Sequence, residues 1–121
     1  SFSSDGNATD VGDMTVARRG SAGHSSTNYG YASGGETGTD VIDKFSFSSD
    51  ANSTDVGNLT SGRATLTGTA STDSIYVSGG HNGSAYVNII EKASISSDGN
   101  ATDVGDLTVS RYLTSTSGSQ Y

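Results

Sequence analysis

The chain has 121 residues, enough for one domain at most, and its 13 acidic against 6 basic residues give a formal net charge of −7. This charge argues against DNA or RNA as a partner, because phosphate neutralisation needs clustered lysine and arginine. The absence of cysteine excludes disulfides, thiolate chemistry and cysteine-ligated metals, and no apolar run approaches the length of a membrane span.

In chain order, the sequence uses one phrase three times. Ser-Phe-Ser-Ser-Asp-Gly-Asn-Ala-Thr-Asp-Val-Gly-Asp occupies residues 1–13 and recurs with few changes at 46–58 and 94–106. Tyr-Ala-Ser-Gly-Gly at 31–35 and Tyr-Val-Ser-Gly-Gly at 76–80 lie between the copies. The first two copies start 45 residues apart and the last two 48 apart. The extra residues fall after the second Gly-Gly pair, so a longer surface loop is expected there.

Each period predicts four short strands separated by turns, and the repeat divides the chain into four parts. Residues 1–16 are expected to hold the end of one unit, from late in its third strand through its fourth. Residues 17–61 and 62–109 are expected to form complete units, and residues 110–121 to supply the first strand of the next. No window shows a helical apolar period, so the predicted fold class is all-β.

In the second complete unit, strands are expected at residues 64–70, 74–78, 86–96 and 101–107. The first has small side chains and is rich in threonine, which is typical of a strand that packs closely against neighbouring units. The second ends at a Gly-Gly pair. Between the last two strands, Ser97-Asp98-Gly99-Asn100 predicts a hairpin with a type I′ turn, because Asp-Gly supplies the positive φ that this turn needs.

Residues 76–80, a loop, and Tyr-Val-Asn-Ile-Ile-Glu-Lys at 86–92 together resemble the kelch repeat. In that family an apolar strand ends in a di-glycine, and a loop, a tyrosine and a strand carrying a glutamate follow. Arg18 followed by His24 is similar to the family's Arg-then-His spacing. The resemblance implies a segment of a kelch-like β-propeller built from four-stranded antiparallel blades. The phrase Ser-Ser-Asp-Gly-Asn-Ala-Thr also resembles the degenerate kelch-like repeats of marine bacteriophage structural proteins.

The sequence departs from the kelch pattern in two ways. The family's outer-strand tryptophan is missing, and the chain contains no proline. The near-identity of the three phrases fits the phage repeats better than a cellular kelch adaptor. A propeller needs at least about four blades to close. The expected partners are therefore further blades of the same polypeptide, which is the favoured alternative, or other copies of the chain.

Loops presented by a rigid scaffold are the usual place for recognition. If a binding face exists, we expect its contributors in the segments after the two Gly-Gly pairs: Glu36, Thr37, His81, Asn82 and Tyr86. The alternative, that these residues are solvated turns, stays open. Tyrosines beside Gly-Gly are expected to pack between blades, and His24 is expected to make a structural hydrogen bond.

Other site types are weighed against simple turns. The Asp-x-Asn-x-Thr-Asp stretches superficially resemble the start of a calcium-binding loop. They lack its glutamate at the twelfth position, so a turn followed by a polar strand is predicted instead. The matches to the N-glycosylation sequon matter only in a eukaryotic secretory pathway. Without a Gly-x-Ser-x-Gly elbow or a His/Asp set in phase, no hydrolase triad is expected, and no metal or cofactor is implied.

These observations lead to a functional expectation. The chain is expected to be a non-enzymatic structural or adhesion module, part of a phage tail or fibre protein, on a virion or extracellular. Its partners would be other virion proteins or a cell-surface glycan. The alternative from another class is the non-catalytic part of a secreted carbohydrate-active propeller enzyme, whose catalytic residues lie outside this stretch. A cellular kelch adaptor is a third possibility.

Overall fold

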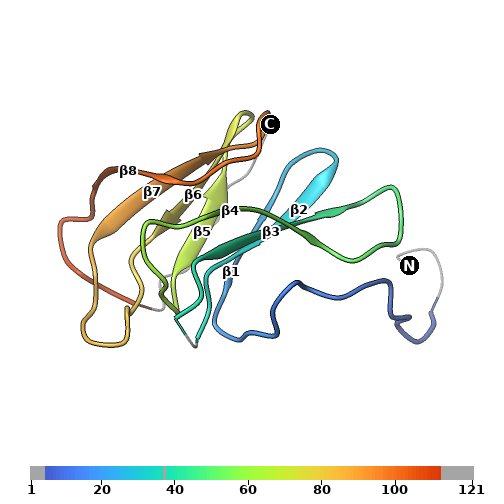
Figure 1. Cartoon of the computed structure of the whole chain (residues 1–121), viewed down its shortest axis with the longest axis horizontal. Helices are drawn as coiled ribbons and strands as arrows, with labels where there is room; N and C mark the ends of the chain where they lie inside the picture. The colour runs from blue at the N-terminus through green and yellow to red at the C-terminus, as the bar shows by residue number, and fades with distance from the viewer. Residues whose placement is uncertain (1–4, 37, 113–121) are drawn as a thin grey trace.

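A computed structural model describes residues 5–36 and 38–112, and these form two antiparallel β-sheets without any helix (Figure 1). The first sheet contains β1 (Ala22–Ser25), β2 (Tyr29–Ser33), β3 (Val41–Ser46) and β4 (Thr54–Asn58). The second contains β5 (Thr67–Ala70), β6 (Ser74–Ser78), β7 (Ile89–Ser94) and β8 (Thr102–Asp106). Each sheet is a meander with its strands in chain order. Within the described residues, no helix could cross a membrane.

The two sheets follow the same plan, as the repeat predicts. β6 begins and ends as predicted, and β5, β7 and β8 lie inside their predicted ranges. Both sheets carry a register shift at the same place in the third strand, after Ile42 and after Ile90. The connection after the Gly-Gly pair covers residues 34–40 in the first sheet and 79–88 in the second. The three extra residues therefore lie in a loop, as predicted.

The Gly-Gly pairs end β2 and β6 for a steric reason. Gly34 and Gly79 have φ values of 65° and 63°, a left-handed conformation that favours glycine. A Cβ on Gly34 would lie 2.7 Å from the carbonyl oxygen of Arg63, and one on Gly79 would lie 2.7 Å from that of Arg111. The di-glycine thus lets the following inter-sheet connection pass close to the strand end.

The prediction for the connection between β7 and β8 is wrong. Gly99 does not have a positive φ, so the connection between β7 and β8 contains no type I′ turn at Asp98-Gly99. The neighbouring sheet shapes this connection instead, because Asn100 and Ala101 hydrogen-bond to the backbone of Asn58. The contact with the neighbouring sheet, and not the local preference of Asp-Gly, determines the conformation of this connection.

The N-terminal segment also differs from the prediction. Residues 5–16, expected to include a fourth strand, hold no strand, because no neighbouring strand in the described part of the chain pairs with them. They run along the first sheet instead, where Ser53 N–H donates to the Asp13 carbonyl at 2.8 Å. The first strand predicted at residues 110–121 falls mainly outside the described residues.

The core lies between the sheets, where β1 packs against β5. Tyr31 is buried there, as predicted for a tyrosine beside Gly-Gly, whereas Tyr76 is only half-buried. His24 of β1 sits over Gly68 of β5, where a Cβ would lie 2.0 Å from the imidazole ring. The remaining buried core members are mostly small or branched: Ala22, Ile42, Leu59, Leu66, Ile75, Val77, Ala93 and Ala101. Glycine and alanine at the contact allow a chain with few large apolar residues to fold.

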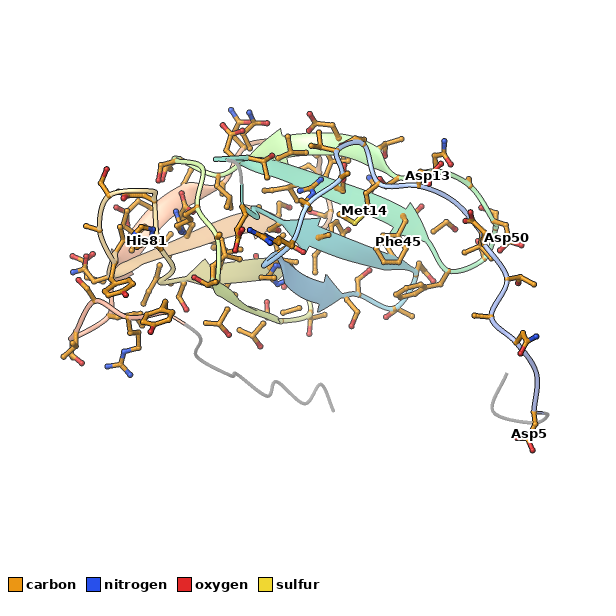
Figure 2. The ribbon with its side chains drawn as sticks, turned by 90° about the horizontal axis from the view of Figure 1, so that it is seen from below. Asp5, Asp13, Met14, Phe45, Asp50 and His81 are labelled. Carbon is orange, nitrogen blue, oxygen red and sulfur yellow. The ribbon has the colours of Figure 1, made fainter. Side chains whose placement is uncertain are left out.

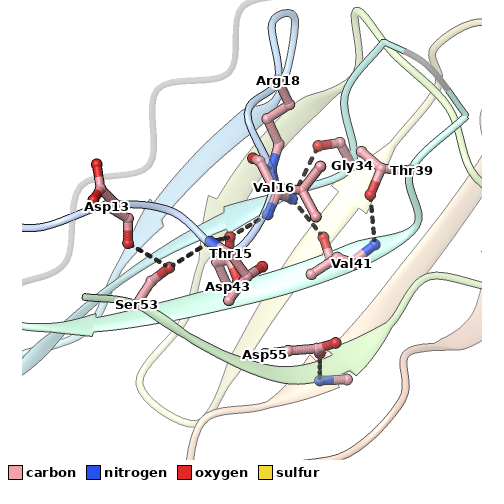
Figure 3. A network of polar contacts seen from close by, with 11 residues as sticks. Asp13, Thr15, Val16, Arg18, Gly34, Thr39, Val41, Asp43, Ser53 and Asp55 are labelled. Carbon is pink, nitrogen blue, oxygen red and sulfur yellow. Dashed lines mark hydrogen bonds and ion pairs between the residues drawn. The ribbon is translucent and has the colours of Figure 1, made fainter.

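Each sheet also buries an ion pair, and Figure 3 shows the first. Arg18 pairs with Asp43 of β3, and both side chains are fully buried. Asp43 Oδ1 accepts a hydrogen bond from the Thr15 hydroxyl at 2.6 Å. Arg18 Nη1 donates to the carbonyls of Gly34 at 3.2 Å and Val41 at 2.9 Å. The arginine therefore ties the connection before β1 to β3 and to the end of β2.

The second sheet repeats this arrangement with different side chains. Arg63 Nη2 lies 2.5 Å from Glu91 Oε2 of β7, an ion pair without hydrogen-bond geometry, and both side chains are fully buried. Glu91 Oε1 accepts from Thr60 N–H at 2.5 Å, and Arg63 Nε donates to the Gly79 carbonyl at 2.9 Å. The glutamate of β7 is thus a structural partner of arginine. Arg18, Arg63 and Arg111 share one phase of the repeat, because they lie 45 and 48 residues apart like the repeated phrase. Arg111 has no acidic partner among the described residues.

Candidate functional site

The connections at the Gly-Gly end of the two sheets enclose a polar groove of about 190 Å³. Glu36 and Gly38 from the first sheet, Ala64 from the connection between the sheets, and His81 and Asn82 from the second sheet line it. Three of the five residues expected on a binding face therefore surround one groove. Thr37, another of the five, lies outside the residues that the structure describes.

His81 has a fixed place in the groove. Its backbone forms two hydrogen bonds with Ala64, at 2.9 and 3.0 Å, which fix the position of residue 81 against the inter-sheet connection. Its Nδ1 accepts a hydrogen bond from Gly83 N–H at 3.1 Å. A nitrogen that accepts carries no proton, so the neutral ring bears its proton on Nε2 and can donate there.

Asn82 and Glu36 combine a structural bond with a free polar group. Asn82 Oδ1 accepts from Ser84 N–H and Ala85 N–H, both at 3.0 Å, and so shapes the turn, while these bonds leave its NH₂ group unused. Glu36 pairs with Arg19, whose side chain is 84% exposed. An exposed pair of this kind is weak, so the carboxylate remains open to exchange with a ligand.

Tyr86, the fifth predicted residue, stands beside the groove and belongs to an aromatic cluster. Its ring meets His81 edge to face at 5.2 Å between centroids. Its ring also stacks on Tyr112 at 4.5 Å and 11° between planes. The Tyr112 hydroxyl raises the pKa of Tyr86. The two tyrosines are 50% and 44% exposed, so the cluster presents aromatic surface to solvent.

Tyr112 was not among the predicted site residues. It follows Arg111 directly, but the residues in the same place after Arg18 and Arg63 are Arg19 and Ala64. The repeat therefore gives no signal for an aromatic residue there. Only the packing of Tyr112 against the longer loop of the second sheet identifies it.

A second, more apolar groove of about 260 Å³ lies between the N-terminal segment and the connection after β3. Val11, Met14 and Phe45 give its apolar lining, and Asp13 and Asp50 lie at it. Figure 2 shows Met14 and Phe45 toward one end of the molecule and His81 toward the other. The sequence analysis did not predict this groove, because it forms between segments distant in sequence. Its lining offers packing surface rather than reactive groups.

The polar side chains of the repeated phrase accept hydrogen bonds from the backbone. Asp10, Asp55 and Asp103 each accept a hydrogen bond from the N–H two residues later, at 3.0 to 3.1 Å. Asn52 and Asn100 accept from the backbone of the preceding unit. Among residues 5–36 and 38–112, no three histidine, cysteine, aspartate or glutamate side chains are grouped so that they could hold a metal ion.

No protein-family model matches the sequence, and no curated protein matches it. The groove must therefore be interpreted from its own chemistry. It offers a hydrogen-bond donor on His81, an amide on Asn82, a carboxylate on Glu36, and exposed aromatic rings beside them.

Proposed function

We propose that the chain is a non-enzymatic adhesion and structural module, a segment of a kelch-like β-propeller in a phage tail or fibre protein, and that its polar groove binds a cell-surface glycan. The stacked, exposed Tyr86–Tyr112 pair beside the groove carries this proposal. Sugar rings have apolar C–H faces that pack on aromatic rings and hydroxyl groups that need both donors and acceptors. The site offers both within one small area.

The propeller part of the proposal is supported by the two equivalent sheets. Each is a four-stranded antiparallel meander, and the first strands of the two sheets, β1 and β5, pack against each other. A propeller is built by repeating such a unit around an axis. The loops that hold the groove would then share one face of the assembly.

The phage part of the proposal, and a place on a virion or outside the cell, are supported by the sequence. The repeated phrase resembles phage structural repeats, and an acidic, cysteine-free chain suits an extracellular particle. Other virion proteins are the second kind of partner in this proposal. The apolar groove near Phe45 is the described surface that suits a protein contact.

A glycan array tests the groove. Replacing Tyr86 by alanine is expected to weaken the strongest glycan interaction by about tenfold, because the aromatic surface beside the groove is lost and such stacking contributes roughly 1 kcal/mol. Tyr29→Ala is the matched control, since Tyr29 is 40% exposed but lies at the other end of β2 from the groove.

Two results would contradict the proposal. The first is the absence of any bound glycan, and the second is equal weakening by the two substitutions. Release of sugar from a bound glycan would instead favour the carbohydrate-active enzyme.

A further inference from the structure

One junction inside the chain shows how successive units attach. Asn100 Oδ1 accepts a hydrogen bond from Asn58 N–H at 3.0 Å, and Ala101 N–H donates to the Asn58 carbonyl at 2.8 Å. Beside this pair of bonds, Gly57 and Gly99 touch so closely that a Cβ on Gly57 would lie 2.2 Å from the Gly99 carbonyl oxygen. The end of β4 therefore receives the connection before β8 through two bonds and a glycine contact.

The same junction occurs once more, between the N-terminal segment and the first sheet. Asn52 Oδ1 accepts from Asp13 N–H at 3.0 Å, and Ser53 N–H donates to the Asp13 carbonyl at 2.8 Å. A Cβ on Gly12 would lie 2.3 Å from the Ala51 carbonyl oxygen. Two independent examples show that the geometry belongs to the repeated phrase and not to one place in the chain.

An ion pair strengthens the junction between the sheets. Lys44 Nζ of β3 lies 2.5 Å from Asp98 Oδ1, two residues before Asn100. The pairing raises the pKa of Lys44. Lys92 holds the same register position in β7 that Lys44 holds in β3, opposite Thr102 and Thr54. Lys92 has no acidic partner among the described residues.

Each junction joins a strand end or segment that ends in Gly-Asp or Gly-Asn, the receiving half, to a segment that carries the docking side chain and N–H, the inserting half. A third receiving half lies at β8, and no segment among the described residues docks on it. All five residues of this edge strand are exposed. A Cβ on Gly105 would meet no atom within 4 Å, whereas the equivalent positions at Gly12 and Gly57 are blocked by backbone. No asparagine of the described chain meets Asp106, which corresponds to Asp13 and Asn58.

The inserting half of the junction is also present and open, at the other end of the chain. Residues 5–8 read Asp-Gly-Asn-Ala, identical to residues 98–101 that dock on β4. All four are exposed, and Ala8 differs in this from its counterpart Ala101, which the internal junction buries to 6% exposure. One chain therefore carries both complementary halves, and it cannot satisfy either from its own described residues.

We propose that residues 5–8 of a second copy of this chain dock on the β8 edge of the first. Asp5 pairs with Lys92, and the backbone of Gly6 packs over Gly105. Asn7 accepts the hydrogen bond from Asp106 N–H, and Ala8 N–H donates to the Asp106 carbonyl. The contact joins different surfaces of the two copies, so it is head-to-tail and continues until a ring closes or a filament forms. It does not depend on glycan binding in the groove.

Sedimentation velocity of the full chain over a wide concentration range tests the proposal. The wild-type chain is expected to associate reversibly as its concentration rises. Asn7→Ala and Gly105→Ala are each expected to raise the dissociation constant by about tenfold or more, since each removes the hydrogen bond or the close approach that both internal junctions use. Asn7 lies in an exposed segment, so its replacement leaves the fold intact. Gly105 has a φ of 155°, which strains alanine, so urea denaturation must first show that the Gly105→Ala chain unfolds like the wild type. Gly6→Ala is the matched control and leaves association unchanged, because Ala51 already occupies that place in one junction.

Mixing the two variants provides a sharper test. A head-to-tail contact allows the intact β8 edge of the Asn7→Ala chain to bind the intact N-terminal segment of the Gly105→Ala chain. Their other surfaces are blocked, so the mixture is expected to form a one-to-one dimer and stop there. A wild-type chain that stays monomeric at every concentration overturns the proposal. So do variants that associate as tightly as the wild type, and so does a mixture that fails to pair.

Discussion

Replacing Glu91 by alanine is expected to lower the free energy of unfolding by about 3–5 kcal/mol, the largest effect of any single side-chain truncation that we foresee in this chain. The substitution leaves the Arg63 guanidinium, whose side chain is fully buried, without its counter-charge. It also removes the acceptor of Thr60 N–H. Domains are stable by only about 5–15 kcal/mol, so the variant should be close to unfolding at room temperature. Urea denaturation followed by far-ultraviolet circular dichroism measures the change.

Two controls separate the buried charge from loss of packing. Glu36→Ala removes a carboxylate from the exposed pair with Arg19, so its cost should stay below about 1 kcal/mol. The double variant Arg63→Met with Glu91→Leu removes both charges and is expected to recover most of the loss, because a buried pair is often replaced by apolar residues at little cost. A Glu91→Ala chain as stable as the Glu36→Ala chain would show that water reaches Arg63 and that the pair is not sealed.

The strands were predictable because the features that end them are local. The Gly-Gly pairs need positive φ, and the repeat places a connection after each of them, so β6 and the longer loop before β7 follow directly from the sequence. The same local reasoning failed at Gly99, where the turn is shaped by Asn58 of the neighbouring unit. The pattern of strands and turns within one unit does not predict which residues of the next unit will contact it.

The site was predictable to a similar extent. The loops after Gly-Gly were identified, and Glu36, His81 and Asn82 do line one groove. The sequence could not show that the side-chain carbonyl of Asn82 accepts hydrogen bonds within its own turn, or that Tyr112 stacks on Tyr86. It also placed Arg18, Arg63 and Arg111 in one phase without revealing that the first two are fully buried with acidic partners. The repeat shows that arginine recurs at the same position in each unit, but only the packing shows what each arginine contacts.

The buried polar groups also explain how this composition can fold. Hydrophobic residues make up 31% of the chain, and the contact between β1 and β5 is made largely of small side chains. Asp43, Arg63 and Glu91 occupy interior volume that larger apolar residues would fill in a richer sequence. Each holds a connection to a strand, so these polar groups fix the arrangement of the sheet as well as filling space. This arrangement makes the stability of the fold sensitive to charge, most clearly at His24.

His24 is expected to make the protein lose stability as the pH falls from about 6.5 to about 4. Burial between the sheets lowers its pKa from 6.5 to about 4, and the hydrogen bond from Nδ1 to the Thr69 carbonyl offsets part of this shift. Its Nε2 has no partner in the described chain, so a second proton there would be buried without an acceptor. Between these two pKa values, His24 is protonated in the unfolded chain and neutral in the folded chain. The free energy of unfolding therefore decreases by about 3 kcal/mol across this window and levels off below it.

Carboxylates titrate in the same range, so the measurement must isolate the histidine. His24→Thr is the natural control, because Thr69 occupies the equivalent position in the second sheet. Urea denaturation of both chains near pH 7.5 and near pH 4 gives the difference in their stabilities at each pH. Shared carboxylate effects cancel, and the difference should shift by about 3 kcal/mol in favour of the threonine variant at the lower pH. Parallel stability curves would mean that His24 accepts its proton in the folded chain. Water would then have to reach Nε2 between β1 and β5, and the tight contact with Gly68 would have to open.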